Sequence, residues 1–159
     1  SVGTMRRIDA ELLQLLAKQA ADSPRRRQHF NLHEDYADPC QRLLNFLWRD
    51  SYIRPHRHTA DPKEETLIAL QGDMGCICFD GEGAVVALTR LTAGHGCPAV
   101  VIEPGEWHTI VALSQSAILL ETKAGPFDPA AAKEPAHWAV EEGAADAPAY
   151  LQSLQALFA

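Results

Sequence analysis

Hydrophobic residues near the start of the chain recur with a helical period, and polar residues separate them. The apolar positions are Ile8, Leu12, Leu15 and Leu16. Asp9 is suited to cap the first turn, and Ile8 can pack onto Leu13 one turn further on. The pattern predicts a short N-terminal helix that ends before Pro24, because proline breaks a helix.

The pattern changes from about residue 29 to residue 122, where short apolar or alternating segments are interrupted by Gly, Pro and Asp. Alternation with a period of two, without a helical repeat, predicts an all-β region. The expected strands are Gln41–Trp48, Tyr52–His58, Thr66–Leu70, Gly75–Phe79, Val85–Leu91, Ala99–Ile102, His108–Ala112 and Ala117–Lys123. Strands of this number and length suit a small barrel or jelly roll.

The two ends of the chain differ from this β region. The connector from Ser23 to Gln28 carries three arginines, which we expect to form a solvated basic turn, with contact to an anion as the alternative. After Pro126 the chain is rich in Ala, Pro and Glu, and then apolar residues from Tyr150 to Phe158 predict a closing helix that packs on the barrel or on a partner subunit. The predicted organisation is residues 1–4 as a tag remnant before Met5, 5–27 as helix and connector, 28–128 as barrel, and 129–159 as tail.

The composition of the chain limits the classes of partner that we expect it to bind. The net charge of −7 provides no basic surface for a phosphate backbone, so we expect no nucleic acid and favour a small ligand. No apolar run approaches the length that spans a bilayer, and the start does not resemble a signal peptide, so we expect a cytoplasmic protein with no membrane contact. The four cysteines include no CxxC pair and are expected to be reduced; Cys76 and Cys78 share a strand face, as buried small side chains or, alternatively, as metal ligands.

A set of potential metal ligands lies within the β region. His56 and His58 are two residues apart, so alternation in a strand sends both imidazoles to the same face. Glu65 begins the next strand, and His108 follows a turn at Pro104 and Gly105. Three imidazoles and one carboxylate suit one divalent ion such as Fe, Mn, Ni or Zn, and leave positions open to water or substrate.

These residues resemble the two motifs of the cupin superfamily. The first is read as His56, His58, Glu65 and Gly72, and the second as Pro104, Gly105 and His108. Six residues separate His58 from Glu65, where three or four are usual, which predicts a lengthened hairpin. Glu64 is the competing carboxylate, but only Glu65 has the spacing to Gly72 that the motif requires, so Glu64 should face solvent.

The resemblance extends over nearly the whole chain to the WbuC-type cupin fold metalloproteins. The supporting residues are Ser23, Pro24, Arg25, Asn31, Leu32, His33, Gln41, Arg42, Ser51, Tyr52, Ile53, Lys123, Gly125, Pro126, Phe127 and Trp138. The resemblance implies an all-β core in the form of a double-stranded β-helix, the cupin or jelly-roll barrel, with an N-terminal helix and a short C-terminal helical tail. It also implies a bound metal and points to cell-surface polysaccharide metabolism.

Strand parity suggests which other side chains surround the metal. Tyr52 and Arg54 share the parity of the two histidines, so we expect both in the cavity as catalytic residues, with Arg54 binding an anionic ligand beside the metal or pairing with Glu121. Glu121 and Lys123 alternate together and either line the cavity or form an exposed pair. Further pocket candidates lie before the first expected strand of the barrel: Asn31 and His33, which alternate with His29 as a lid or as a solvated edge strand.

Two functions remain open at this point. One is a metal-dependent isomerase or oxygenase that acts on a small anionic or sugar-like metabolite, with Tyr52 or a metal-bound water moving protons. The other is a non-catalytic cupin that binds a small molecule through the same ion. We expect a homodimer in either case.

Overall fold

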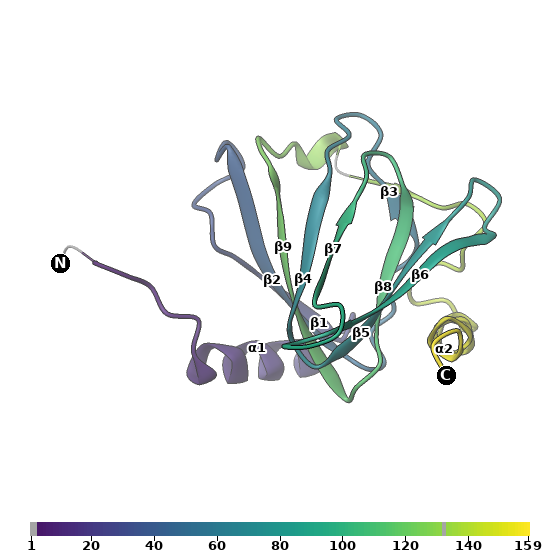
Figure 1. Cartoon of the computed structure of the whole chain (residues 1–159), viewed down its shortest axis with the longest axis horizontal. Helices are drawn as coiled ribbons and strands as arrows, with labels where there is room; N and C mark the ends of the chain where they lie inside the picture. The colour runs from purple at the N-terminus through teal and green to yellow at the C-terminus, as the bar shows by residue number, and fades with distance from the viewer. Residues whose placement is uncertain (1–2, 132) are drawn as a thin grey trace.

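Two five-stranded antiparallel sheets pack face to face as a jelly-roll barrel (Figure 1). The computed structural model describes residues 3–131 and 133–159; Ser1 and Val2, from the expected tag remnant, lie outside the described residues. The first sheet has the order β1-β2-β9-β4-β7 and the second β10-β3-β8-β5-β6. The strands are β1 (Arg27–Asn31), β2 (Cys40–Trp48), β3 (His56–Arg57), β4 (Glu65–Gln71), β5 (Asp73–Phe79), β6 (Val85–Thr92), β7 (Ala99–Ile102), β8 (Trp107–Ala112), β9 (Ser116–Ala124) and β10 (Glu134–Pro135).

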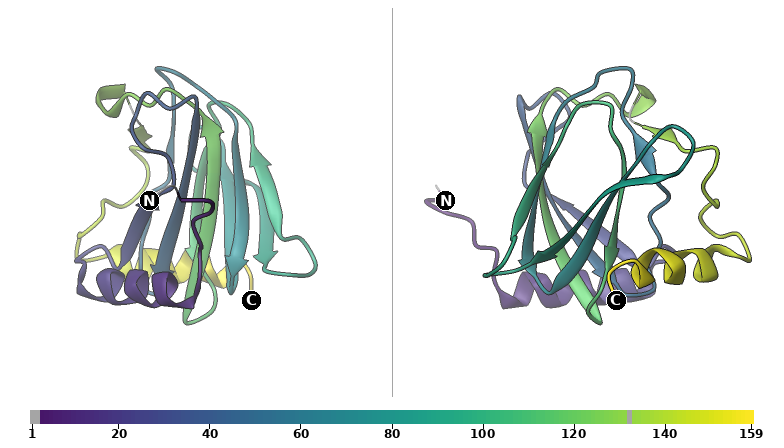
Figure 2. Two further views of the ribbon diagram at one scale, coloured as in Figure 1. Left: turned by 90° about the vertical axis from the view of Figure 1, so that its left-hand side faces the viewer. Right: turned by 45° about the vertical axis from the view of Figure 1, so that its right-hand side comes forward.

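A helix packs against the outer face of the first sheet. Helix α1 (Ala10–Asp22) begins where the sequence predicts, because the Asp9 carboxylate accepts a hydrogen bond from the Leu12 amide at 3.1 Å. Its buried residues Leu16 and Ala20 belong to one hydrophobic cluster with Leu44 and Phe46 of β2 and Ile118 of β9. Figure 2 shows α1 lying along this sheet.

The C-terminal segment covers the outer face of the second sheet. Helix α2 (Ala147–Ala156) buries Leu151 and Leu154 against a cluster that includes Phe79 and Trp107. A short 3₁₀ helix, η1 (Pro129–Ala131), begins the segment, and β10 then pairs with β3. The predicted fold class, an all-β core with a helix at each end of the chain, is confirmed.

The interior between the sheets changes from apolar at one end of the barrel to polar at the other. On β9 the inward positions are Ala117 and Leu119 in the core, then Glu121 and Lys123 in a cavity. The same change occurs on β4 and β8, where aliphatic core residues follow Glu65 and His108 along the chain. Each strand therefore contributes both to the core and to the cavity.

Two sequence predictions of local structure are wrong. The strand expected over Tyr52–His58 is reduced to His56 and Arg57, because residues up to the buried Pro55 do not join the ladder. The basic connector is not wholly solvated either: Arg27 begins β1 and is only 5% exposed. Within the described residues no helix is both long enough and apolar enough to cross a membrane.

Candidate metal centre and cavity

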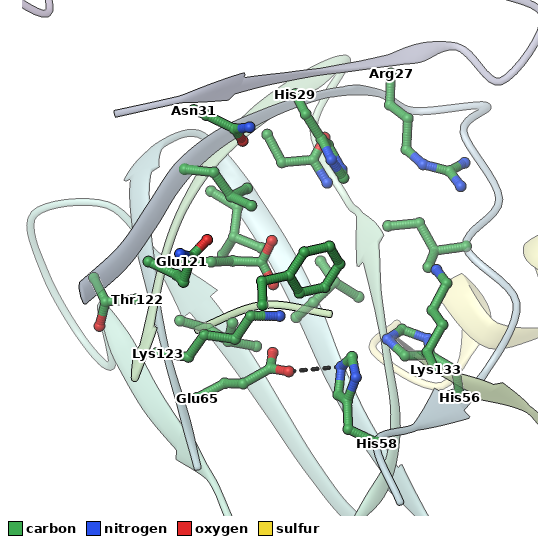
Figure 3. A pocket seen from close by; sticks show the side chains of 18 of the residues that line it. Arg27, His29, Asn31, His56, His58, Glu65, Glu121, Thr122, Lys123 and Lys133 are labelled. Atoms are coloured by element: carbon green, nitrogen blue, oxygen red, sulfur yellow. Dashed lines mark ion pairs between the residues drawn. The ribbon is translucent and has the colours of Figure 1, made fainter. Parts of the chain in front are cut away.

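The four predicted metal ligands come together from three strands at the polar end of the barrel. His56 in β3 is paired in register with His108 in β8. His58 directly follows β3, and Glu65 is the first residue of β4. Figure 3 shows His58 and Glu65 facing each other, with His56 beside them. All four line one cavity, whereas Glu64 is exposed as expected.

The distances describe a close cluster of nitrogen and oxygen donors. Nε2 of His58 lies 2.8 Å from Oε1 of Glu65, and Nε2 of His108 lies 3.9 Å from Oε2. The ring centres of His56 and His108 are 4.7 Å apart, and those of His56 and His58 are 5.7 Å apart. Ligands about 2.1 Å from one ion would themselves be about 3 Å apart.

Backbone carbonyls orient two of the imidazoles. Nδ1 of His56 is 2.9 Å from the Arg54 carbonyl, and Nδ1 of His108 is 2.8 Å from the Glu106 carbonyl. A carbonyl only accepts, so each Nδ1 carries the proton of the neutral ring and Nε2 keeps its lone pair. Burial lowers the pKa of His56 and of His108, which keeps both rings neutral near pH 7. Neutral, oriented imidazoles are what a divalent metal requires.

Glu65 provides the negative charge of the cluster. Burial acts to raise its pKa, but the contact with His58 and the nearby His108 and Lys123 outweigh burial and lower the pKa to about 2. Oε1 is buried without a hydrogen bond of good geometry, although Nε2 of His58 is close to it. In residues 3–131 and 133–159 no three His, Cys, Asp or Glu side chains stand in a geometry that could hold a metal ion. The donor chemistry therefore fits a divalent ion, while the donor atoms are spaced as a close cluster of imidazoles and a carboxylate.

The cluster lies in the wall of a cavity of about 340 Å³, a size that suits a small metabolite. Glu121 and Lys123 both line it, which decides between the two arrangements that the sequence left open. Asn31 and His33 line it as well, and the buried His33 ring contacts the backbone of Arg42 through Nδ1. These candidate pocket residues are thus together in one place.

The expected positions of Tyr52 and Arg54 are wrong. The Tyr52 hydroxyl donates to the Val140 carbonyl at 2.5 Å, and the Arg54 guanidinium donates to the Ala136 carbonyl at 2.8 Å. Neither side chain lines the cavity, and Ile53 does so instead. Because residues 52–55 are not in a strand, the parity of the histidines does not extend back to them. Arg54 therefore forms neither the expected pair with Glu121 nor a clamp beside the histidines.

Sequence reasoning missed other polar side chains of the cavity, above all Arg27 and Lys133 (Figure 3). Arg27 was included in the basic connector, and Lys133 lies in the Ala-rich tail. For Arg27, the alternation of Arg27, His29 and Asn31 was a usable signal, since all three line the cavity from β1. For Lys133 no local pattern exists, because long-range packing of the tail brings it to the cavity.

The cysteines lie away from the cavity lining. All four are free; Cys76 is buried in the core between the sheets, and Cys78 packs against that core. This placement agrees with the interpretation of the pair as small interior side chains.

The sequence matches the model of one known protein family. Residues 8–91, just over half of the 159, match the family model described as Domain of unknown function (DUF6016). The chain belongs to the DUF6016 family. The matched segment contains His56, His58 and Glu65 but ends before His108. No curated protein matches the sequence.

Solved structures resemble this DUF6016 chain in fold. An HTH_3 family transcriptional regulator from Vibrio cholerae is 18% identical over 72% of this chain and 60% of its own, with a TM-score of 0.52. An oxalate oxidase in complex with the substrate analogue glycolate is 15% identical over 66% and 54%, with a TM-score of 0.53. KdgF from Halomonas sp. is 20% identical over 67% and 84%, with a TM-score of 0.52.

The chain thus spans 60% or less of the length of the first two structures. Oxalate oxidase and KdgF are cupin proteins, so the likeness identifies the barrel as a cupin fold. At these identities it identifies nothing finer.

Proposed function

We propose that this protein is a metal-binding cupin that holds one divalent ion on His56, His58, Glu65 and His108 and acts on a small anionic metabolite. The observation that carries the proposal is the meeting of three imidazoles and one buried carboxylate in the wall of a single cavity. The chemistry of this donor set suits Fe, Mn, Ni or Zn.

The reaction we favour is isomerase-type or oxygenase-type. When bound, the ion would supply Lewis-acid polarisation of a ligand oxygen. Within the chain, Glu121 is the group suited to move a proton, since it lines the same cavity and burial, with the nearby Glu65, raises its pKa to about 7. Non-catalytic binding of a small molecule is the alternative. The fold alone does not distinguish an enzyme from a binding protein, because both an oxidase and a transcriptional regulator share it. The WbuC-type resemblance adds a role in polysaccharide metabolism to this proposal.

Metal analysis of purified protein tests the proposal. Wild type should contain one divalent ion per chain, and the double variant His56→Ala/His108→Ala should contain little, because two of the four ligands are gone. The matched control is His95→Ala/His137→Ala, which removes two exposed histidines outside the cavity. Full metal content in the His56 and His108 double variant would reject the metal site.

The adjacent carboxylates provide a finer test. Glu65→Gln should weaken metal binding at least about tenfold, because an amide is a poorer ligand than a carboxylate. Glu64→Gln should leave binding unchanged, since Glu64 is exposed and outside the cavity. Competition with a metal-sensitive dye measures both, and the reverse result would assign the ligand to Glu64.

A further inference from the structure

The residues that line the cavity carry more positive than negative groups, whereas the chain as a whole carries more negative ones. The whole protein has 14 Lys and Arg against 21 Asp and Glu. The residues that line the cavity include four cations, Arg25, Arg27, Lys123 and Lys133, but only the two carboxylates of Glu65 and Glu121. A concave site whose sign opposes that of the rest of the molecule concentrates ligands of the opposite charge, here anions.

Three of these cations gather on the wall formed by β1, its connector and the C-terminal segment. Glu142 is their carboxylate partner, 3.1 Å from Nε of Arg25 and 2.7 Å from an Nη of Arg27. The Lys133 ammonium makes no ion pair within the described part of the chain. Three cations against one carboxylate leave an excess of positive charge on this wall.

The position of this wall relative to the histidines determines what it can bind. In Figure 3, Arg27 and Lys133 lie on the side of the cavity away from Glu65 and Lys123, and Lys133 is next to His56. The wall is therefore continuous with the proposed metal centre, so one small molecule can reach both. The Arg27 guanidinium is buried and held by the Tyr52 carbonyl at 3.1 Å, which fixes its orientation.

The pKa of His29 reflects the same excess of positive charge in the cavity. The residue lies on β1 between Arg27 and Asn31 and lines the cavity. His29 is exposed overall, but loss of water around its cavity-facing ring lowers its pKa, and four neighbours lower it further, to about 4: Arg27, Lys133, Arg25 and Lys123. All four are cations, so the potential at this ring is positive.

We propose that Arg25, Arg27 and Lys133 form an anion subsite beside the histidine cluster, so that the ligand carries a second acidic group besides the one that meets the metal. This inference rests on the proposed function for the metal end, and it adds the ligand class: a small molecule with two carboxylate or phosphate groups. Guanidinium and ammonium groups bind both kinds of oxyanion.

Two acids that differ in this second group test the subsite. Malate and lactate share a 2-hydroxy acid end, but only malate has a second carboxylate. Calorimetry with Zn²⁺-loaded wild type should give binding of malate about tenfold tighter than of lactate. In Lys133→Met the malate affinity should fall about threefold to tenfold, while lactate affinity stays within about twofold, because a partly exposed cation contributes modestly. Lys18→Met, on the exposed face of α1, is the matched control.

Arg25→Met repeats the test at an exposed residue whose loss leaves the Arg27 pair with Glu142 in place. If malate and lactate bind wild type equally, or if both variants bind malate as Lys18→Met does, the subsite does not exist.

Titration of metal-free protein with inorganic phosphate at low salt separates the two proposals. Tighter phosphate binding by wild type than by Lys133→Met supports the subsite even if wild type holds no metal, whereas equal binding rejects the subsite even if metal content is full.

Discussion

Glu121 shows how the environment of one residue sets its chemistry. On β9 it is flanked by Leu119 and Lys123 at alternate positions, and all three point into the interior. In the register of β4 and β9, Lys123 is opposite Glu65 and Glu121 is opposite Leu67. Glu121 is thus a diagonal neighbour of Glu65, about 7 to 8 Å away and somewhat less between Cβ atoms. Burial and the Glu65 charge favour its neutral form, and Lys123 and Lys133 oppose them.

We expect Glu121→Gln to stabilise the metal-free protein in a pH-dependent way. The pKa of Glu121 is about 7 in the folded state and near 4.5 when unfolded, so the folded state binds more protons between these values. The wild type therefore loses stability as pH rises from about 4.5 to 7, and an uncharged amide avoids that loss. Urea unfolding should show Glu121→Gln more stable by about 1 to 2 kcal/mol near pH 8 and equal to wild type near pH 4.5. The control, exposed Glu103→Gln, should show no such difference. A constant offset at all pH values would assign the effect to packing.

At the scale of elements, alternation predicts the interior correctly where hydrogen-bonded ladders fix the strands. Glu65, His108, Glu121 and Lys123 face the cavity because β4, β8 and β9 are paired on both sides. Alternation fails at Tyr52 and Arg54, where the chain is not in a ladder. The fold class, the helix cap at Asp9 and most strands could therefore be read from local pattern.

What could not be predicted is the part of the cavity that distant segments build together. Arg27 meets Glu142 across 115 positions of the chain, and Lys133 belongs to the same tail. The tail is held by β10, by the Ala136 amide that donates to the Pro55 carbonyl at 2.9 Å, and by the ion pair of Arg57 with Glu134 at 2.8 Å. None of these contacts leaves a periodic signal in the sequence.

The junction between β9 and the tail provides a prediction at this scale. A Cβ on Gly125 would lie 1.8 Å from the Asp38 carbonyl oxygen, a backbone atom that cannot turn away. Gly125→Ala should therefore destabilise the fold by about 2 kcal/mol or more and shift Phe127, which lines the cavity. Gly81→Ala is the matched control, because no heavy atom lies within 4 Å of its Cβ. Urea denaturation measures both; equal stability of the two variants would mean that the Asp38 loop moves at little cost.

At the scale of the whole molecule, the two ends of the barrel differ: one end holds the apolar core that stabilises the fold, and the other holds the polar cavity. Aliphatic side chains fill one end between the sheets, and each outer face is covered by a terminal segment of the chain. The polar end is left with buried ionisable groups, Glu65 and His108 among them. Burying such groups without a partner costs free energy. The homodimer expected from the sequence stays a prediction, for which the exposed Val86 and Leu88 on edge strand β6 are the apolar residues to examine.

A bound ion should therefore raise the stability of the entire barrel, because its ligands come from β3, β4 and β8 and both sheets must be assembled to bring them together. An ion at about 100 times its dissociation constant adds about 2.7 kcal/mol to the free energy of unfolding. For a chain of this size that shifts Tm by about 5 to 10 °C. Thermal unfolding with added Zn²⁺, Ni²⁺ or Mn²⁺ should show such a rise for at least one ion, and EDTA should reverse it. His56→Ala/His108→Ala should show no rise, whereas His95→Ala/His137→Ala should behave as wild type. An equal rise in both double variants would mean that the ions bind elsewhere, since only the first variant lacks ligands that join β3 to β8.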